Sequence, residues 1–219
     1  MESSKYLEDI ASIKTMMSRS SRFMSLSGLS GILAGVYALV AAVIAHYLIQ
    51  GHIQLFATNR EDFLNLIMRM FASVELAGNL IILFLVTLLL AIGTSIVLTY
   101  KKAAKNKESI WDSSSKRLIA NFAIPLIAGG IFSIVLIQYG IVGLIAPATL
   151  IFYGLALVNA SKYTLGDIKY LGLANVIIGL FATQFIGYGL YFWALGFGVF
   201  HIIYGAIMYN KYDRQKDEK

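Results

Sequence analysis

The chain has 219 residues, of which 58% are hydrophobic and 14% charged, with 18 Lys and Arg against 12 Asp and Glu and no cysteine. Charged residues make up about 25% of an ordinary soluble domain, so this composition excludes that class. The lack of cysteine excludes disulfides and thiolate metal sites, and it leaves the redox compartment open.

Uncharged stretches predict the membrane spans. A helix rises about 1.5 Å per residue and needs about 20 apolar residues to cross a bilayer core. The runs without Asp, Glu, Lys or Arg are 23–59, 76–100, 118–161 and 170–210. The last two are each long enough for two crossings, with turns expected at Gln138-Tyr139-Gly140 and Gly187-Tyr188-Gly189. We therefore expect six transmembrane helices, at roughly 23–49, 75–100, 117–137, 140–160, 169–186 and 189–209.

The fold class is thus an all-α integral membrane protein in three parts. Residues 1–22 form a cytoplasmic N-terminal segment, 23–210 the six-helix transmembrane domain, and 211–219 a charged cytoplasmic tail. Positively charged loops stay cytoplasmic, and 16 of the 18 basic residues fall on the side that holds both termini. A cleaved signal peptide is not expected, because a mostly polar segment precedes a first apolar run that is too long.

The N-terminal segment contains an amphipathic helix over residues 4–18, with apolar side chains at helical spacing. Such a helix either anchors the chain to the inner membrane face or presents a docking surface for a partner or second copy. The first membrane helix carries small residues in two adjacent rows. These rows, Ser27, Gly31 and Gly35, and Ser30, Ala34, Ala38 and Ala42, predict close helix packing, most simply within the chain.

The second membrane helix has a start signal well before its uncharged run. Thr58 with Glu61, and Asn59 with Asp62, resemble a capping box, so we expect the helix to begin near Arg60 and to project outside the membrane or bend onto its surface. The basic loop that follows it, 101–117, predicts an attraction for anionic lipid. The basic residues assigned to that contact are Lys101, Lys102, Lys105 and Lys107. Nucleic-acid binding is not expected, because the loop has one aromatic residue and no binding module.

Glycine tetrads suggest an internal repeat. Gly35-Val36-Tyr37-Ala38, Gly130-Ile131-Phe132-Ser133 and Gly179-Leu180-Phe181-Ala182 share one pattern and fall in the odd-numbered helices. One interpretation is a threefold repeat of helix hairpins; the other is shared composition of apolar, glycine-rich helices. Pro125 and Pro147, each about a third of the way into its helix, predict kinks.

Reactive groups are scarce. The chain lacks HExxH, a Walker loop, GxSxG, a dinucleotide fingerprint and paired carboxylates, so we predict no enzyme activity, no cofactor and no metal site. Ionisable groups within a bilayer are functional candidates by default. The polar candidates are His201 near the midplane, Glu75 near the outer end of the second helix and Gln184 near the outer end of the fifth. Structural alternatives are a neutral, internally bonded His201 and an interfacial Glu75 paired with Arg69. Further amides are Asn121 and Asn175, near the inner ends of the third and fifth helices.

Two stretches, YLEDIASIKTMMSRSSRFMSLSGLSGILAGVYAL at 6–39 and YGLYFWALGFGVFHIIYGAIMYNKYDR at 188–214, carry a family resemblance. They look like a family of uncharacterised bacterial multi-pass inner-membrane proteins. The resemblance implies a location in the bacterial cytoplasmic membrane and assigns no activity, cofactor or site.

Two functions fit this sequence. The first is a non-catalytic membrane protein that acts through association with lipid, with a protein partner or with a second copy, in a regulatory role. It follows from the missing chemistry, the 4–18 helix, the basic loop and the small-residue face. The second is a small transporter or channel for a neutral or apolar solute, suggested by the repeat, the two prolines and His201.

Overall fold

The computed structural model describes residues 6, 23, 26–55, 63–106 and 110–214, which form helices joined by short turns. The long helices are α2 (Gly28–Leu55), α3 (Phe63–Asn106), α4 (Ser113–Gln138), α5 (Ile145–Ala160) and α6 (Ile168–Ala182). A final continuous helix, called the last helix below, consists of α7 (Gly189–Trp193), the π-helical η3 (Ala194–Val199), α8 (Phe200–Met208) and the π-helical η4 (Tyr209–Asp213). Short 3-10 turns, η1 (Val142–Leu144) and η2 (Ser161–Tyr163), flank α5.

Five helical segments are long and apolar enough to cross a membrane. They are Gly28–Gln54, Met70–Asn106, Ser113–Gln138, Val142–Tyr163 and Gly189–Asp213. The helix α6 is also apolar but has only 15 residues. The chain is therefore an all-α, multi-pass membrane protein, as the uncharged stretches predict.

The two predicted glycine turns are confirmed, because Gly140 has φ +70° and Gly187 has φ +99°, a region that glycine enters without strain. The second helix extends past the predicted 75–100 at both ends, and its first described residue, Phe63, lies close to the start expected near Arg60. This helix, α3, runs from Phe63 to Asn106, so part of the expected loop 101–117 is helical. Lys and Ala are good helix formers and no Gly or Pro interrupts this part of the chain, so charge ends the membrane-embedded part without ending the helix.

Several predictions lie outside the described residues. They are the amphipathic helix at 4–18 apart from Tyr6, the capping box at 58–62, the lipid contact of Lys107 and the tail beyond Arg214.

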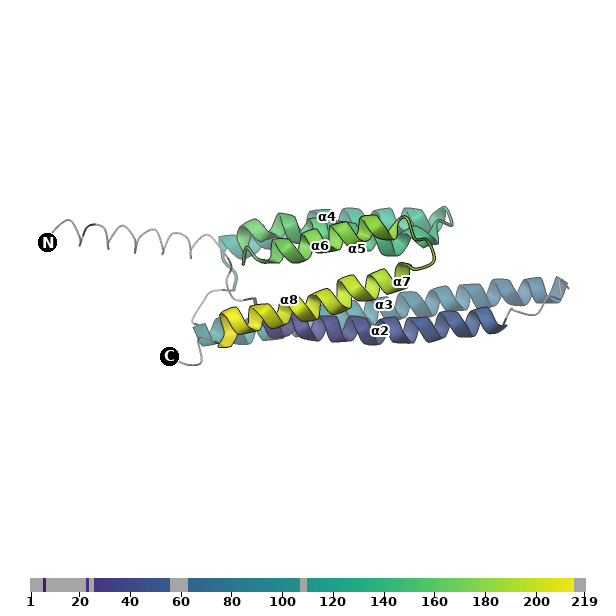
Figure 1. The fold of residues 1–219 in the computed structure, drawn as a ribbon, viewed down its shortest axis with the longest axis horizontal. Coiled ribbons are helices and arrows are strands. Elements are labelled where there is room, and N and C mark those ends of the chain that lie inside the picture. The colour runs from purple at the N-terminus through teal and green to yellow at the C-terminus, as the bar shows by residue number, and fades with distance from the viewer. Residues whose placement is uncertain (1–5, 7–22, 24–25, 56–62, 107–109, 215–219) are drawn as a thin grey trace.

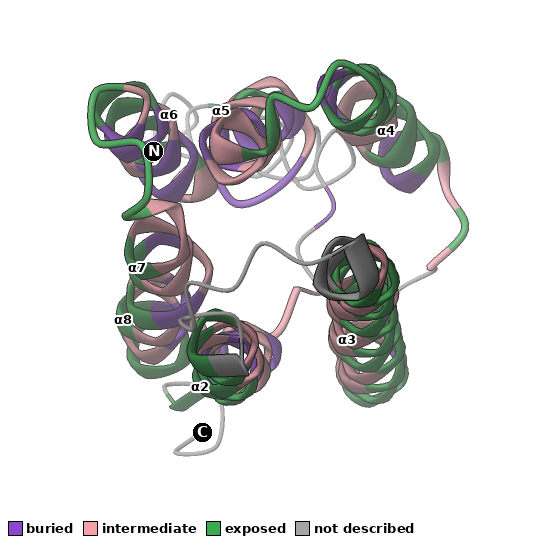
Figure 2. Ribbon diagram, turned by 90° about the vertical axis from the view of Figure 1, so that its right-hand side faces the viewer, coloured by how far each residue is buried: buried purple, intermediate pink, exposed green. Residues whose placement is uncertain are grey.

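The helices form two layers (Figure 1). One layer contains α4, α5 and α6, and the other contains α2 and α3. The last helix connects the layers, since α7 packs on α5 and α6 while η3 and α8 pack on α2. Seen along the bundle, α3 occupies an outer corner and lies apart from α5 and α6 (Figure 2). The helix against which α3 packs is α2.

Glycines hold the last helix against α2. A Cβ atom built on Gly205 would lie 2.5 Å from the backbone nitrogen of Ile32 and 2.7 Å from the carbonyl oxygen of Gly28. A Cβ on Gly35 would lie 2.6 Å from the carbonyl oxygen of Gly198. Real side chains do not fit at these separations, so the two backbones touch directly. The prediction that the small-residue face of the first helix packs within the chain is confirmed for Gly31 and Gly35.

A second close contact joins α5 to α6, where Gly154 and Gly172 each face the carbonyl oxygen of the other. The three tetrad glycines differ in their surroundings. Gly35 and Gly179 have close neighbours on other helices, whereas Gly130 has no atom within 4 Å of a built Cβ. The threefold repeat therefore stays a prediction.

The structure corrects the expectation of a kink at Pro147. This proline is the third residue of α5, which begins at Ile145 after the turn η1. The N–H groups of a first helical turn have no partner inside the helix, so a proline there removes no helical hydrogen bond. The second proline, Pro125, lies inside α4, which continues past it to Gln138.

Polar contacts tie one end of the bundle together. Lys102 Nζ lies 2.5 Å from Asp213 Oδ1 and donates a 2.6 Å hydrogen bond to the carbonyl oxygen of Leu26. The other Asp213 oxygen accepts a 2.9 Å hydrogen bond from the Gly28 N–H, so the end of the last helix caps the start of α2. A carboxylate at a helix N-terminus also interacts favourably with the helix dipole.

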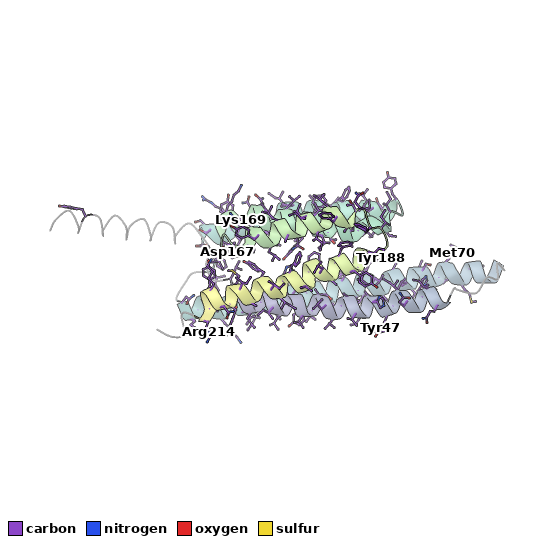
Figure 3. The ribbon with its side chains drawn as sticks, viewed as in Figure 1. Tyr47, Met70, Asp167, Lys169, Tyr188 and Arg214 are labelled. Carbon is purple, nitrogen blue, oxygen red and sulfur yellow. The ribbon has the colours of Figure 1, made fainter. Side chains whose placement is uncertain are left out.

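The same end contains two more contacts between distant segments. Phe23 donates its N–H to the carbonyl oxygen of Tyr163 (2.8 Å) and accepts a hydrogen bond from the buried Thr164 hydroxyl (2.7 Å). Asp167 pairs with Lys211 at 2.6 Å and accepts from Tyr212. The hydrogen bond from Lys211 holds the pKa of the Asp167 carboxyl below its ordinary value. Figure 3 shows Asp167, Lys169 and Arg214 at this end, opposite Met70.

The glycine contact predicts a sharp difference between two substitutions. Gly205→Ala should destabilise the protein by about 1–3 kcal/mol, because its Cβ meets only backbone atoms that cannot move aside. Gly130→Ala is the matched control in an equally apolar helix and should leave stability unchanged or slightly raised, because nothing lies near its Cβ. Unfolding of both variants by SDS titration in mixed micelles measures the difference. Equal stability of the two variants would contradict the close contact.

Candidate functional site

His201 is the candidate that the structure places most deeply. It is the second residue of α8, directly after the π-helical η3, and its side chain is 6% exposed. The aromatic rings around it come from three helices. Phe197 stacks on the imidazole with centroids 6.0 Å apart, and Tyr153 of α5 lies 4.9 Å from Phe197. Phe122 of α4 then meets Tyr153 edge-on, which extends the aromatic cluster across the layer.

Both ring nitrogens of His201 have internal partners. Nδ1 lies 2.9 Å from the carbonyl oxygen of Gly196, and Nε2 lies 2.7 Å from the Tyr153 hydroxyl. A carbonyl oxygen can only accept, so Nδ1 carries the proton. Nε2 of the neutral ring then accepts from the Tyr153 hydroxyl. The imidazole therefore has no hydrogen-bonding capacity left for a substrate unless one of these bonds breaks.

The π-helix leaves the Gly196 carbonyl oxygen without its usual backbone donor. In η3 the Phe200 N–H donates to Leu195, five residues back, instead of to Gly196, four residues back. The Gly196 oxygen thus lacks its α-helical donor from Phe200, and the His201 side chain supplies one. The glycine-rich sequence around Phe197 is the only signal in the chain for this irregularity, and it indicates a weak helix without predicting a π-helix.

Asn175 is a buried amide on the other side of Gly196. Its side chain is fully buried in α6, and its Nδ2 donates a 2.9 Å hydrogen bond to the carbonyl oxygen of Leu171. Its Oδ1 has no hydrogen-bond partner among the described residues. A Cβ built on Gly196 would lie 2.7 Å from this oxygen, so Asn175 packs directly against the π-helix. Sequence reasoning noted Asn175 as an amide near the inner end of the fifth helix but did not select it, and it missed Tyr153, which no motif marks.

Glu75 and Gln184 do not join this cluster. Both side chains are exposed. Gln184 donates to its neighbour Thr183 in the turn after α6, and Glu75 lies on α3. The expected pairing of Glu75 with Arg69 concerns a side chain that is not described. The three candidates therefore do not form one site.

The other histidines and the acidic side chains of the described residues lie apart from His201. No group of three His, Cys, Asp or Glu side chains gathers in the part of the chain that the structure describes. His52 approaches the Ser73 hydroxyl at 3.5 Å, and His46 contacts the rings of Tyr47 and Tyr191. No carboxylate appears among the hydrogen-bond partners of His201. We interpret the two hydrogen bonds of His201, to Tyr153 and to Gly196, as a structural link that holds α5 against the last helix.

Two surface grooves are apolar, and neither reaches His201. One lies between α2 and α3. The other lies between α6 and the last helix and is lined by Ala174, Ile177, Ile178, Phe181, Phe192, Leu195 and Phe200.

The surface of α3 is the second candidate region. This helix has 44 residues, and no residue of its most apolar segment is buried. Its exposed apolar side chains extend from Met68 to Tyr100. Of the lysines assigned to anionic lipid, Lys102 instead holds Asp213, so its charge is used inside the protein.

Comparisons with protein-family models, curated proteins and solved structures gave no match.

The hydrogen bonds of His201 predict that substitutions of Tyr153 and His201 have coupled effects on the free energy of unfolding. Tyr153→Phe leaves Nε2 of His201 without its donor, and His201→Phe leaves the Gly196 carbonyl without its side-chain donor. Each substitution should cost about 1–2 kcal/mol, and the double variant should cost clearly less than the sum. Unfolding in mixed micelles measures this cycle, with the exposed Tyr139→Phe as a neutral control. Strict additivity would show that the two side chains do not act as a pair.

Proposed function

We propose that this protein is a non-catalytic, multi-pass membrane protein that acts by association, and that the α2–α3 hairpin is its association surface. The observation that carries the proposal is the unburied apolar surface of α3, which continues beyond the rest of the bundle. The internally satisfied His201 and the absence of a catalytic constellation in the sequence support a role without chemistry.

The projection of the hairpin follows from contacts along α2. The His46 ring lies 6.2 Å from the Tyr191 ring near the start of the last helix, so His46 marks the level at which the last helix begins. Six residues further along α2, His52 is level with Ser73 of α3. The helix α3 then continues to Phe63. At 1.5 Å per residue, α3 projects about 24 Å beyond Tyr191. Figure 3 shows Met70 well beyond Tyr188 and Tyr47.

Apolar side chains cover this projection. Tyr47, Met68, Met70, Phe71 and Val74 are all more than half exposed. On the same scale the side chains from Val74 to Met68 lie about 8 to 17 Å beyond Tyr191. Tyrosine side chains at helix ends mark the membrane–water interface, so this apolar surface extends past the hydrocarbon core. A protein surface is the covering that matches an apolar, helical and rigid projection.

The membrane arrangement is part of this proposal. Six crossings, with α6 as a short sixth one, place both chain ends on the cytoplasmic side of a bacterial inner membrane, as the family resemblance implies. The exposed Phe185 and Ile186 extend the apolar length of α6 beyond its 15 residues. The proposed orientation leaves Lys101, Lys105 and the exposed Trp111 at the cytoplasmic face, where anionic lipid headgroups lie.

A second candidate is a small carrier or channel for a neutral or apolar solute. The fully buried Asn175 oxygen, which has no hydrogen-bond partner in the described part of the chain, favours it, because a polar ligand or water could satisfy a buried acceptor beside a π-helix. In that case the surface of α3 would face only lipid.

Cysteine labelling tests the orientation in intact cells, since the chain has no native thiol. Tyr139→Cys, in the exposed turn after α4, should react with a membrane-impermeant maleimide added from outside. Lys162→Cys, exposed at the opposite end, should react only after the cells are opened. The reverse pattern would overturn the proposed orientation.

Photo-crosslinking in native membranes tests the association. A photoreactive residue at Phe71, which is 74% exposed, should form protein adducts, because the proposal places a protein on this surface. The same residue at Tyr139, which is 77% exposed in the turn after α4, is the control and should form lipid adducts or none. Lipid adducts alone at both positions would exclude the association function and favour the carrier.

A further inference from the structure

The groove between α2 and α3, called the α2–α3 groove below, lies toward the C-terminal end of α3. Its volume is about 370 Å³, within the range of about 300–1,000 Å³ that ligand sites occupy. Leu33 of α2 and six residues of α3 between Leu89 and Leu98 line it. The hydroxyl of Thr94, one of these six, donates to the carbonyl oxygen of Leu90 in its own helix. The groove therefore offers an apolar surface to a ligand.

A lysine lies at one end of the α2–α3 groove. Thr94, Val97 and Lys101 follow one another at spacings of three and four residues, so they lie on one face of α3. On α2 the exposed Leu29 lies one turn before Leu33 and continues the opposite wall in the same direction. The groove therefore leads from apolar side chains to a positive charge.

The charge of Lys101 is available to a ligand, whereas that of the next residue is not. Lys102 pairs with Asp213 and donates to the carbonyl oxygen of Leu26. Lys101 is exposed and forms no ion pair or hydrogen bond with a described residue. Consecutive residues of a helix point about 100° apart, so the two lysines face different sides of α3. One lysine holds the fold together, and the other remains at the end of the groove.

The length of the α2–α3 groove matches one leaflet of a bilayer. From Leu89 to Lys101 the rise along α3 is about 18 Å, and half of a hydrocarbon core is about 15 Å. Tyr100, next to Lys101, is 64% exposed, and exposed tyrosines at the ends of membrane helices mark the headgroup level. Lys101 thus lies at the level of the lipid phosphates, and the groove lies at the level of the acyl chains.

We propose that the α2–α3 groove binds one anionic phospholipid of the cytoplasmic leaflet, with an acyl chain against Leu33 and Gly93 and the phosphate at Lys101. The inference rests on the proposed membrane orientation, which places this end of α3 on the cytoplasmic side, where anionic lipids are found. It names the lipid and the site for the lipid association that the proposed function includes.

The other apolar groove, between α6 and the last helix, shows what the lysine adds. Its volume, about 390 Å³, is similar. Its lining residue closest to the start of α6 is Ala174, and the residue one turn nearer to that start on the same face is Tyr170. An acyl chain alone fits either groove. Only the α2–α3 groove places a lysine one turn beyond its apolar wall, so it is the groove that favours a negatively charged headgroup.

Lipid titration of the full chain in detergent micelles tests the headgroup, with native mass spectrometry to count bound lipids. Dioleoylphosphatidylglycerol is the anionic probe, and dioleoylphosphatidylcholine has the same chains without net charge. The anionic lipid should bind about fivefold more tightly, because a basic residue near the headgroup contributes about that factor. Lys101→Gln should abolish this preference. Lys162→Gln, at an exposed lysine of the same end of the bundle, is the matched control and should preserve it.

Gly93→Leu tests the acyl-chain part of the site. No atom of the described chain lies within 4 Å of a Cβ built on Gly93, so a leucine fits the fold but fills the groove. It should weaken binding of the anionic lipid about tenfold, because the chain loses apolar contact. Gly130→Leu, at an equally open glycine of α4, should leave binding unchanged. The SDS concentration at the midpoint of unfolding, measured for each variant, identifies any loss that comes from misfolding.

Two results would overturn the proposal. One is equal binding of the two lipids by the unmodified chain, and the other is an equal loss in Lys101→Gln and Lys162→Gln. Lipid binding that fails while Phe71 still forms protein adducts excludes this site and leaves the association function intact. Labelling of Lys162→Cys from outside the cell would instead exclude the cytoplasmic leaflet, even if the lipid binds.

Discussion

The direct backbone contact between α2 and the last helix determines the arrangement of the whole bundle. Gly28, Gly35 and Gly205 lie so close to backbone atoms of the facing helix that a Cβ atom at any of these three positions would displace the backbone. Lipid gives helices no hydrophobic reason to associate, so close backbone packing supplies the attraction. The contact joins the layer of α4, α5 and α6 to α2, since the last helix also packs on α5 and α6. It also leaves α3 with α2 as its neighbour.

Polar contacts determine which arrangement of the packed helices forms. The Asp213 carboxylate caps the start of α2 and pairs with Lys102, which fixes three helix ends at one end of the bundle. Near the middle of the last helix, His201 bridges the π-helix and Tyr153. In an apolar environment an unpaired polar group is costly, so satisfied pairs select one arrangement of helices among several that glycine packing alone would allow.

Sequence alone could predict the membrane helices and their turns, because a bilayer excludes charge and requires uncharged runs of a minimum length. It could not predict the partners of His201. That contact depends on a π-helical register shift in η3 and on Tyr153, which lies 48 positions away in the chain. The role of Lys102 was missed for a related reason. A lysine beside a membrane span is typical of a lipid contact, and only the fold shows that Asp213 lies next to Lys102. The length of α3 was underestimated, since charge marks the edge of the membrane and not the end of a helix.

The unequal lengths of the helices connect the fold to the proposed function. The α5 helix has 16 residues and α6 has 15, whereas α3 has 44. A bilayer adjusts to a mismatch of a few ångströms by local thinning or helix tilt, but not to a projection of about 24 Å. A projecting helix that carried only polar residues would need no partner. Because α3 retains Met70, Phe71 and Val74 on its surface, its exposed apolar surface continues past the start of the last helix, and a protein surface is the covering that the proposed function assigns to it.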